Sequence, residues 1–437
     1  MKVLKFGGTS VGTPQRMKDV VELISDGEQK IVVLSAMSGT TNTLVEISDY
    51  LYKKNPEGAH ETINQLELKY KHHVDELFTS EEYKEKTWLI LKEIFEYIRS
   101  FTKGIFTMYE EKIIVGQGEL LSTNMVTNYL LEQGYNACLL PALDFMRTDK
   151  NGEPDLEYII DRLSGLLDSH SDKEIYITQG FICRNAYGEM DNLQRGGSDY
   201  TASLIGAAIK ASEIQIWTDI DGMHNNDPRI VDNTSPVGQL HFEEAAELAY
   251  FGAKILHPTC IQPAKFAGIP VKLLNTMDPS APGTVISNKT ENKKFKAVAA
   301  KDDITAINII SSRMLLAHGF LRKIFEIFET YKTSIDMICT SEVGVSLTID
   351  NTSHLSQIVN ELKKFGTVKI DDNMCIICVV GDLDWHNVGF ETRATDAMKN
   401  IPVRMISYGG STHNISFLVS ASDKKRALQA LSDTLFN

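Results

Sequence analysis

The stretch MKVLKFGGTSVG, residues 1–12, decides how the rest of the chain is interpreted. Val3 to Phe6 predicts a short apolar strand, and Gly7-Gly8 leaves it with no Cβ to keep the backbone away from a ligand. Thr9-Ser10 then offers hydroxyls and N–H groups where a helix could begin. Such a turn, with Lys5 beside it, can hold a phosphate, although its spacing is not that of a Walker A loop. The same residues would also suit an ordinary strand and turn with a solvated lysine.

The composition is that of an ordinary globular protein with an acidic balance. The 437 residues suggest two to four domains, and 43% of them are hydrophobic and 23% charged. The net charge is -14, and no dense Lys/Arg block offsets it, which argues against a nucleic-acid or anionic-membrane partner. No apolar run is long enough to cross a membrane, and Lys5 with the glycines after it interrupts any leader-like segment. We therefore expect a cytoplasmic location.

Six scattered cysteines predict reduced, buried thiols. Cys375 and Cys378 form a CxxC, but it lies in the apolar run CIICVV, which predicts a strand. Residues i and i+3 of a strand face opposite sides, so we expect no shared metal and no protein metal site.

The first 285 residues alternate strands and helices in the manner of a mostly parallel sheet. The all-apolar run 31–34 predicts a strand buried on both faces, followed by a loop of small and hydroxylic residues at 35–42. Residues 44–112 have helical spacing and predict a helical excursion that could act as a lid, a brace or both. Residues 113–122 are interpreted as a strand and turn, with Glu119 opening a helix. Further strands are expected at 175–181, 214–217 and 271–274, helices at 14–25, 200–210 and 242–250, and a domain boundary between 285 and 295.

The tail repeats itself. Two successive patterns of the βαββαβ, ferredoxin-like kind follow residue 304, and the second lacks its last strand. Residues 295–303 are strand-like. We therefore expect the first unit, about 304–372, to be inserted in a second unit made of about 295–303 and 373–437.

Charged residues recur where the predicted strands end. Lys5, Glu119 and the Arg195–Asp199 loop would meet at one edge of a parallel sheet. Phosphoryl transfer needs positioning and charge neutralisation rather than covalent help from the protein, and these residues could supply both. Glu119, Arg195 and Asp199 taken singly would suit structural roles equally well.

Six motifs in order resemble the aspartate kinase family. They are KFGGTSVG from Lys5, SAMSGTTNTL from Ser35, GQGELLS from Gly116, RGGSDYTA from Arg195, TDIDGMHNNDPR from Thr218 and KILHP from Lys254. The resemblance covers about 300 residues, and the tail resembles that family's paired ACT regulatory domains. It implies an α/β fold: a three-layer αβα amino-acid-kinase sandwich with a mostly parallel sheet, residues 1–285, followed by two ferredoxin-like ACT units, residues 295–437.

The resemblance also implies an activity and a set of site residues. The activity is ATP-dependent phosphorylation of the β-carboxylate of L-aspartate, the first step toward lysine, threonine and methionine. Lys5 would stabilise the transferring phosphoryl group, Asp199 would orient Lys5, and Mg²⁺ would arrive on the ATP phosphates. L-aspartate would be held by Thr41, Glu119, Arg195 and Ser198; the nucleotide would be lined by Lys5, Gly7, Gly8, Thr9, Thr218, Asp219, His224, Asp227, Arg229 and Lys254. His224 stands where the family pattern leads us to expect a tyrosine.

In the tail, the resemblance implies an amino-acid effector site and self-association. The effector-binding residues would be Met314, His318, Gly319, Phe320, Asp336 and Ser341. Lysine is the first choice of effector and threonine the second. A homodimer or homotetramer formed through the ACT units is expected.

Two alternatives stay open from the sequence. One is a kinase of the same fold that phosphorylates another amino acid, such as glutamate or acetylglutamate. The other is a non-catalytic amino-acid sensor, against which the presence of Lys5, Arg195 and Asp199 argues.

Overall fold

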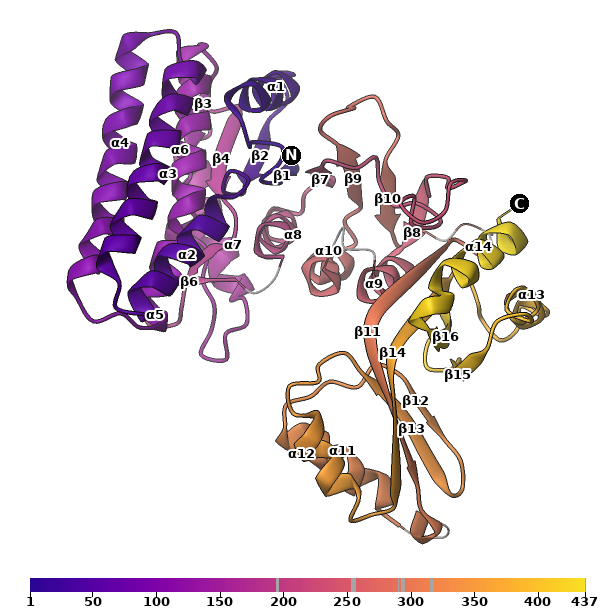
Figure 1. Cartoon of the computed structure of the whole chain (residues 1–437). Helices are drawn as coiled ribbons and strands as arrows, with labels where there is room; N and C mark the ends of the chain where they lie inside the picture. Colours follow the sequence, from indigo (N-terminus) through magenta and orange to yellow (C-terminus); the bar gives the residue numbers. More distant parts are fainter. Residues whose placement is uncertain (194–195, 253–256, 290, 292–294, 315–317, 437) are drawn as a thin grey trace. The chain divides into compact units, whose positions relative to one another are not determined.

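The structure of the chain, a computed structural model (Figure 1), describes all residues except 194–195, 253–256, 290, 292–294, 315–317 and 437. It divides into two compact units. Unit 1 comprises residues 1–222 and 256–288; unit 2 comprises residues 223–255 and 289–437. Among the described residues, no helix is long and apolar enough to cross a membrane.

Unit 1 contains a mostly parallel sheet in the order β3-β4-β2-β1-β7-β9-β10. β1, β2, β4, β7 and β9 run parallel to their neighbours, whereas β10 is antiparallel to β9. The carboxyl ends of the parallel strands therefore meet at one edge. The strands are β1 (Lys2–Phe6), β2 (Lys30–Leu34), β3 (Ala137–Leu139), β4 (Ile175–Gln179), β7 (Ile214–Thr218), β9 (Val271–Asn275) and β10 (Thr284–Ser287), with a hairpin β5 (Ile182–Arg184) and β6 (Met190–Asn192).

Helices cover both faces of this sheet, so the three-layer αβα fold class is confirmed. α1 (Pro14–Ile24) and α6 (Gln117–Glu132) share one apolar cluster with Leu4, Phe6 and other sheet residues. α8 (Gly197–Ile209) contacts β1, β2 and β7 and is flanked by α7 (Leu156–Ser169) and α10 (Gln262–Ala267). Val3 and Leu4 point to opposite faces because strand side chains alternate, and both are buried.

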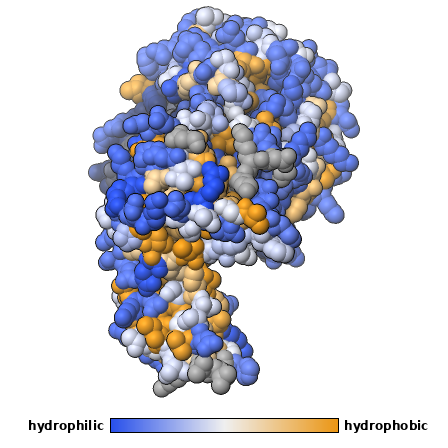
Figure 2. Space-filling view, turned by 90° about the vertical axis from the view of Figure 1, so that its right-hand side faces the viewer, coloured by the Kyte–Doolittle hydropathy of each residue, from blue (hydrophilic) through white to orange (hydrophobic). Residues whose placement is uncertain are grey.

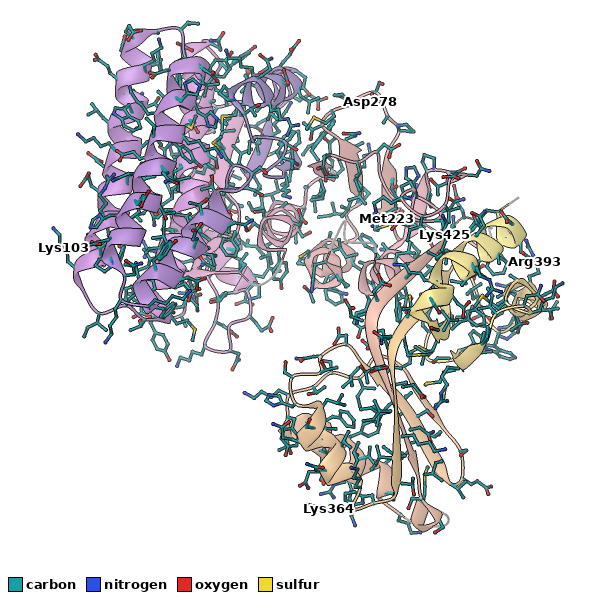
Figure 3. All side chains as sticks on the ribbon, viewed as in Figure 1. Lys103, Met223, Asp278, Lys364, Arg393 and Lys425 are labelled. Atoms are coloured by element: carbon teal, nitrogen blue, oxygen red, sulfur yellow. The ribbon has the colours of Figure 1, made fainter. Side chains whose placement is uncertain are left out.

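The expected helical excursion is present. α2 (Thr40–Tyr52), α3 (Pro56–Leu77) and α4 (Glu81–Ser100) contribute buried side chains to the same cluster as α6 and the sheet. Side chains fill the space between these helices and the sheet, while Lys103 of the turn after α4 points outward (Figure 3). The excursion is thus part of the core of unit 1.

Two local predictions are wrong. Residues 113–115 belong to helix α5 (Met108–Val115), not to a strand; a capping box between Thr107 and Glu110 starts the helix, and burial explains the apolar run that suggested a strand. The strand expected over 175–181 ends at Gln179. The helix predicted over 14–25 is confirmed: it begins at Pro14, capped by the Thr13 side chain, so Thr9-Ser10 precedes it in the turn after β1.

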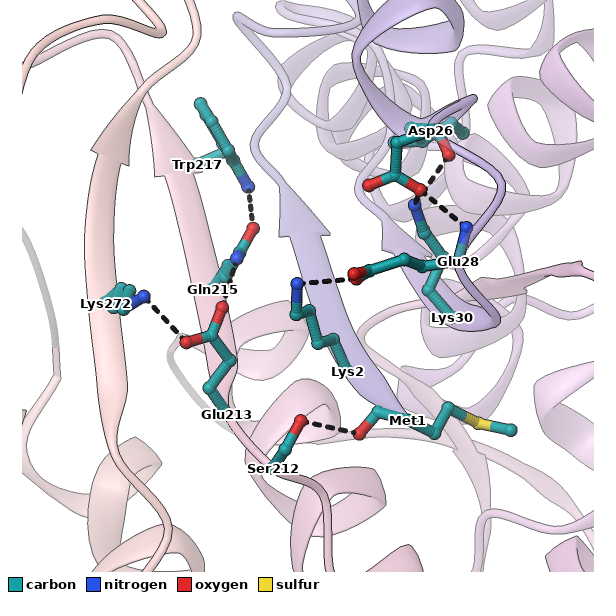
Figure 4. Close-up of polar contacts among 11 residues, drawn as sticks. Met1, Lys2, Asp26, Glu28, Lys30, Ser212, Glu213, Gln215, Trp217 and Lys272 are labelled. Carbon is teal, nitrogen blue, oxygen red and sulfur yellow. Dashed lines mark hydrogen bonds and ion pairs between the residues drawn. The ribbon is translucent and has the colours of Figure 1, made fainter.

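A polar network lies at the opposite end of the strands, near their amino termini (Figure 4). Lys2 Nζ lies 2.6 Å from Glu28 Oε2, and Lys272 Nζ lies 2.7 Å from Glu213 Oε2. The two ion pairs join β1 and β9 to the residues that precede β2 and β7. Nearer the carboxyl end of β7, Trp217 Nε1 donates to Gln215 Oε1 within the strand at 3.0 Å.

Unit 2 is built on an antiparallel sheet in the order β12-β13-β11-β14-β16-β15, with two apolar cores. The strands are β11 (Ala297–Ile310), β12 (Ile338–Thr340), β13 (Gly344–Ile349), β14 (Thr367–Val380), β15 (Val403–Ser407) and β16 (Asn414–Ser420). The helices are α11 (Phe320–Thr330), α12 (Leu355–Leu362), α13 (Phe390–Ala397) and α14 (Lys424–Leu435). β8 (Gln239–His241) and α9 (Phe242–Tyr250) also belong to unit 2.

The two halves of this sheet share their central strands. Ala297–Lys301 pairs with Ile376–Val380, and Ile307–Ile310 pairs with Thr367–Ile370, with register shifts after Lys301. The pairing of 297–301 with the second repeat is what an inserted first unit requires. The sequence had suggested separate strands where the structure has two 14-residue strands that run through both halves.

Candidate active site

The carboxyl edge of the unit 1 sheet carries a cavity of about 400 Å³. Its walls come from the turn after β1, the loop after β2, the start of α6, and the segment that opens α8. The lining residues are Lys5, Gly8, Ser35, Ala36, Met37, Ser38, Gly39, Thr41, Asn42, Glu119, Phe181, Gly196, Gly197, Ser198 and Asp199.

The turn after β1 is packed tightly against the loop after β2. Ser38 N–H donates to the Gly8 carbonyl at 3.0 Å, and a Cβ on Gly8 would lie 2.8 Å from the Ala36 carbonyl oxygen. Only glycine permits this approach. Gly7 donates its N–H to the Trp217 carbonyl at 3.2 Å, so that amide is already used. Phosphate binding by this turn would therefore depend on the amides of Gly8 and Thr9.

A lysine and a carboxylate form an ion pair at the cavity wall. Lys5 Nζ lies 2.7 Å from Asp199 Oδ1, and the two side chains are 12% and 14% exposed. β1 presents Lys5 and the first turn of α8 presents Asp199. The pair holds the ammonium group in a fixed place at the cavity, where it can face an anionic ligand.

Glu119 is a buried carboxyl group aimed at the same cavity. Its side chain stands in the first turn of α6, and Oε1 accepts the Ala36 N–H at 3.2 Å. Among the residues that the structure describes, Oε2 has no hydrogen-bond partner. Burial raises the pKa of Glu119 to about 8. The hydrogen bond from the Ala36 amide lowers this pKa, but by less than burial raises it. A buried carboxyl with a spare oxygen is suited to a ligand cation such as an ammonium group.

Phe181 is a cavity residue that the sequence did not single out. Its φ is +68°, a left-handed conformation that is strained for a bulky residue. Thr201 Oγ1 accepts the Phe181 N–H at 3.0 Å and so stabilises this backbone. Gly180, directly before Phe181, was the available signal, because strands that end in glycine often turn sharply.

Some of the predicted site residues line the cavity, and others do not. Lys5, Gly8, Thr41, Glu119, Ser198 and Asp199 line the cavity, and Gly7 and Thr9 belong to the adjoining turn. Thr218 and Asp219 follow β7, the neighbour of β1, and Thr218 Oγ1 donates to Asp219 Oδ1 at 3.1 Å. Arg195 and Lys254 lie outside the described residues.

The remaining nucleotide candidates belong to unit 2. Arg229 Nε and Nη2 donate to the two oxygens of Asp227 at 2.9 and 2.7 Å, and this pairing lowers the pKa of Asp227. His224 Nδ1 lies 2.9 Å from Thr234 Oγ1. The structure describes these contacts within unit 2 only.

The effector candidates also belong to unit 2. Phe320 is buried at the start of α11, which Gly319 caps in the left-handed conformation, while His318 and Ser341 are exposed. Met314 packs against the core that contains Phe320. The Asp336 side chain is fully buried, and its Oδ1 accepts from Lys301 Nζ at 2.6 Å and from the Tyr250 hydroxyl at 2.8 Å. Burial raises the pKa of Asp336, although Lys301 opposes the shift.

Within the described residues, one cluster brings three potential metal-ligand atoms within 4.8 Å of one another: His241, Glu243 and His413 of unit 2. His241 Nδ1 accepts the Glu243 N–H at 3.3 Å and thereby caps α9, so the neutral ring carries its proton on Nε2. A cation there would face the positive end of the α9 dipole. Helix capping and the 3.0 Å contact between His413 Nε2 and Glu243 Oε2 account for the cluster.

Residues 1–275, which include most of the sheet and the cavity, match the sequence pattern of the amino acid kinase family, and residues 377–435 match an ACT domain pattern. The chain is 33% identical to "Lysine-sensitive aspartokinase 3" of Escherichia coli K12 over 99% of both chains. It is 36% identical to "Aspartokinase 1, chloroplastic" of Arabidopsis thaliana over 99% of this chain and 80% of the relative. Within the amino acid kinases, the chain belongs to the aspartokinases.

Two solved structures have the same fold over the full length of both chains. One is E. coli aspartokinase III in complex with aspartate and ADP, with a TM-score of 0.85 and 33% identity. The other is the same E. coli protein in complex with lysine and aspartate, with a TM-score of 0.83 and 34% identity.

Proposed function

We propose that the cavity of unit 1 binds L-aspartate beside ATP and transfers the γ-phosphoryl group to the β-carboxylate, giving 4-phospho-L-aspartate and ADP. The observation that carries this proposal is the convergence of the Lys5–Asp199 pair and the carboxyl group of Glu119 on one cavity. The ammonium group of Lys5 suits the oxygens of the transferring phosphoryl group. The carboxyl group of Glu119 suits the ammonium group of an amino acid.

The reaction needs no general base. The β-carboxylate of aspartate is ionised near neutral pH, because the pKa of such a group is about 4. One of its oxygens attacks Pγ while the bond from Pγ to the bridging oxygen breaks and ADP leaves. Lys5 stabilises the negative charge on the transferring group, and Asp199 keeps Lys5 in position.

Aspartate is oriented by its other two charged groups. Glu119 receives the ammonium group, Thr41 and Ser198 contribute hydroxyls, and Arg195 pairs with the α-carboxylate. The β-carboxylate is then left to face ATP. In this proposal the nucleotide contacts Gly7, Gly8, Thr9, Thr218 and Asp219 of unit 1. For His224, Asp227, Arg229 and Lys254 a nucleotide contact stays a prediction from the family resemblance.

Mg²⁺ enters this proposal with the ATP phosphates. The two carboxyl groups that line the cavity are Asp199, which is paired with Lys5, and Glu119, whose raised pKa keeps it largely protonated near pH 7. Neither is arranged as a magnesium ligand, whereas the oxygens of ATP suit that ion. The ion would neutralise phosphate charge and orient the triphosphate.

The direct test is ATP turnover by the purified chain with L-aspartate and, separately, with L-glutamate. We expect product only with L-aspartate. Turnover with L-glutamate alone would assign the chain to another amino acid, and no turnover with either would favour the non-catalytic sensor.

We further propose that residues 1–285 act as the catalytic domain and residues 295–437 as the regulatory domain, with lysine as the effector and threonine as second choice. Support comes from the lysine sensitivity in the name of the E. coli relative and from the chemistry of Asp336. Its Oδ2 is buried and, within the described part of the chain, has no hydrogen-bond partner. An effector ammonium can bind there beside Lys301 and Tyr250, with Met314, His318, Gly319, Phe320 and Ser341 around it. Inhibition then follows from tighter binding of lysine to one conformer.

Asp336→Asn is expected to raise the lysine concentration for half-inhibition by about tenfold or more, because it removes the buried charge that binds the ammonium group. The matched control is Asp350→Asn. Asp350 contacts the same Lys301 at 3.0 Å but is partly exposed, so we expect a change of less than about twofold. Equal effects of the two substitutions on inhibition would show that Lys301, not the effector, is the relevant partner of Asp336.

Self-association is proposed through unit 2. Figure 2 shows apolar side chains gathered on the part of unit 2 that contains β12 and β13 in Figure 1. Exposed apolar residues of the antiparallel sheet and its loops include Ile310, Ile338, Val343, Ile370 and Ile406. A second copy would cover such a surface. A homodimer or homotetramer in the cytoplasm fits these residues and the six free cysteines.

A further inference from the structure

Tyr70 lies on α3, in the helical excursion, and has no exposed surface. Its hydroxyl lies 2.9 Å from Thr40 Oγ1, which is also buried. The ring packs edge-on against Phe95 of α4, with centroids 5.8 Å apart. The position of the Tyr70 hydroxyl is therefore fixed by packing within the core.

The partner of Tyr70 starts the helix that carries a cavity residue. Thr40 is the first residue of α2, and Thr41, next along the chain, lines the cavity. Gly39, before it, has φ +83° and offers no side-chain cap. The hydroxyl pair is thus a side-chain tie that holds the beginning of α2 to α3.

The same threonine borders Glu119. A Cβ on Gly118 would lie 3.3 Å from Thr40 Cγ2, so Thr40 packs against the backbone directly before Glu119. Burial raises the pKa of Tyr70, and the nearby charge of Glu119 adds to that shift. Thr40 therefore adjoins both residues proposed to hold aspartate: it precedes Thr41 in the chain and packs against the residue before Glu119.

We propose that Tyr70, from outside the cavity, is a positioning residue for aspartate: its hydroxyl fixes Thr40 and thereby sets the places of Thr41 and Glu119. This inference rests on the proposed function. It gives the helical excursion a specific role, that of a rigid support for the amino-acid subsite. Lys69, the preceding residue, extends the support, since its Nζ lies 3.5 Å from the Ser38 carbonyl oxygen.

The test is Tyr70→Phe, with steady-state kinetics for both substrates. The substitution keeps the ring and leaves the Thr40 hydroxyl buried without its partner, which the start of α2 can relieve only by moving. We expect the KM for aspartate to rise about tenfold, with kcat and the KM for ATP changed less than about threefold. Tyr97→Phe is the matched control: Tyr97 also belongs to the excursion but is 47% exposed, and we expect unchanged kinetics.

Two substitutions at Thr40 separate positioning from general destabilisation. Thr40→Ser keeps the hydroxyl and is expected to keep the KM for aspartate within about twofold, whereas Thr40→Val should raise it as Tyr70→Phe does. In the double variant Tyr70→Phe/Thr40→Val the two effects should not multiply, because both remove the same interaction. The Thr40 variants also test the inference should Tyr70→Phe fail to fold.

The outcomes distinguish this inference from the proposed function. If the unaltered protein phosphorylates aspartate and Tyr70→Phe has the same KM for aspartate, the positioning role is overturned and the function stands. Multiplying effects in the double variant would also overturn it, since Tyr70 and Thr40 would then act independently. If the unaltered protein does not phosphorylate aspartate, the function fails and the inference fails with it.

Discussion

Lys5→Ala is expected to lower kcat by about a thousandfold or more while the fold persists. Among the cavity residues that the structure describes, Lys5 is the cation; it is held 2.7 Å from Asp199 and is largely shielded from water. A phosphoryl group in transfer spreads negative charge over its oxygens, and a fixed ammonium group in a partly dry site stabilises that charge without reorganising. Alanine removes this stabilisation, and the other lysine of β1, Lys2, cannot replace it because it lies at the amino end of the strand.

The matched control for this prediction is Lys2→Ala. Lys2 belongs to the same strand but pairs with Glu28 at the opposite end of the sheet (Figure 4). We expect its kcat to stay within about twofold of the unaltered protein, since an exposed ion pair contributes little. Circular dichroism and thermal unfolding of both variants check the fold. A Lys5→Ala protein that turns over aspartate at the normal rate would remove Lys5 from the catalytic step.

Glu119→Gln is expected to raise the KM for aspartate about a hundredfold, because a neutral amide cannot balance an ammonium group in a buried site. The side chain keeps its shape, so the cavity walls should stay in place. Gln65→Glu, on an exposed face of α3, changes the charge by one unit and is a control for long-range electrostatics. An unchanged KM in Glu119→Gln would place the aspartate ammonium elsewhere.

The raised pKa of Glu119 predicts how the KM for aspartate changes with pH. In the free protein the group titrates at about 8, so at pH 6–7 it is mostly protonated and must lose its proton to bind an ammonium group. The apparent KM for aspartate should therefore fall about tenfold per pH unit up to pH 8 and then level off. Glu119→Gln should abolish this slope, and a slope that survives in the variant would assign the titration to another group.

The same group links stability to pH. Between its ordinary pKa of about 4.5 and its folded value of about 8, the folded protein binds more protons than the unfolded chain, so stability falls as pH rises through that window. Glu119→Gln removes this loss of stability at high pH, because glutamine does not titrate. Thermal unfolding should therefore show the unliganded variant gaining Tm over the unaltered protein at pH 8 but not at pH 4.

Much of this architecture followed from local patterns in the sequence. The all-apolar run at β2 predicted a strand buried on both faces, and the structure shows every residue of Lys30–Leu34 buried. The repeated order in the tail predicted two ferredoxin-like units, and the glycines at positions 7, 8, 196 and 197 marked the loops that form the cavity. These features are local: side-chain alternation, helical spacing and the lack of a Cβ act over a few residues.

The local patterns misled where burial and strand length depended on distant residues. Ile113, Ile114 and Val115 suggested a strand because they are apolar and branched, yet a capping box starts a helix there. The continuity of β11 and β14 through both halves of unit 2 is set by pairing between segments some 70 residues apart. A short stretch of sequence cannot reveal this pairing, because it does not contain both partners.

The sequence by itself determined most strands of unit 1, the glycine-rich loops after them and the residue types that a phosphoryl-transfer site needs, because each is encoded by neighbouring residues. Tertiary structure alone decided that Glu119 is buried with an oxygen that has no hydrogen-bond partner among the described residues, and that Tyr70 reaches Thr40. The physical reason is that burial and hydrogen bonding depend on which segments meet in space, and a carboxyl group acquires a raised pKa only when distant parts of the chain exclude water from it.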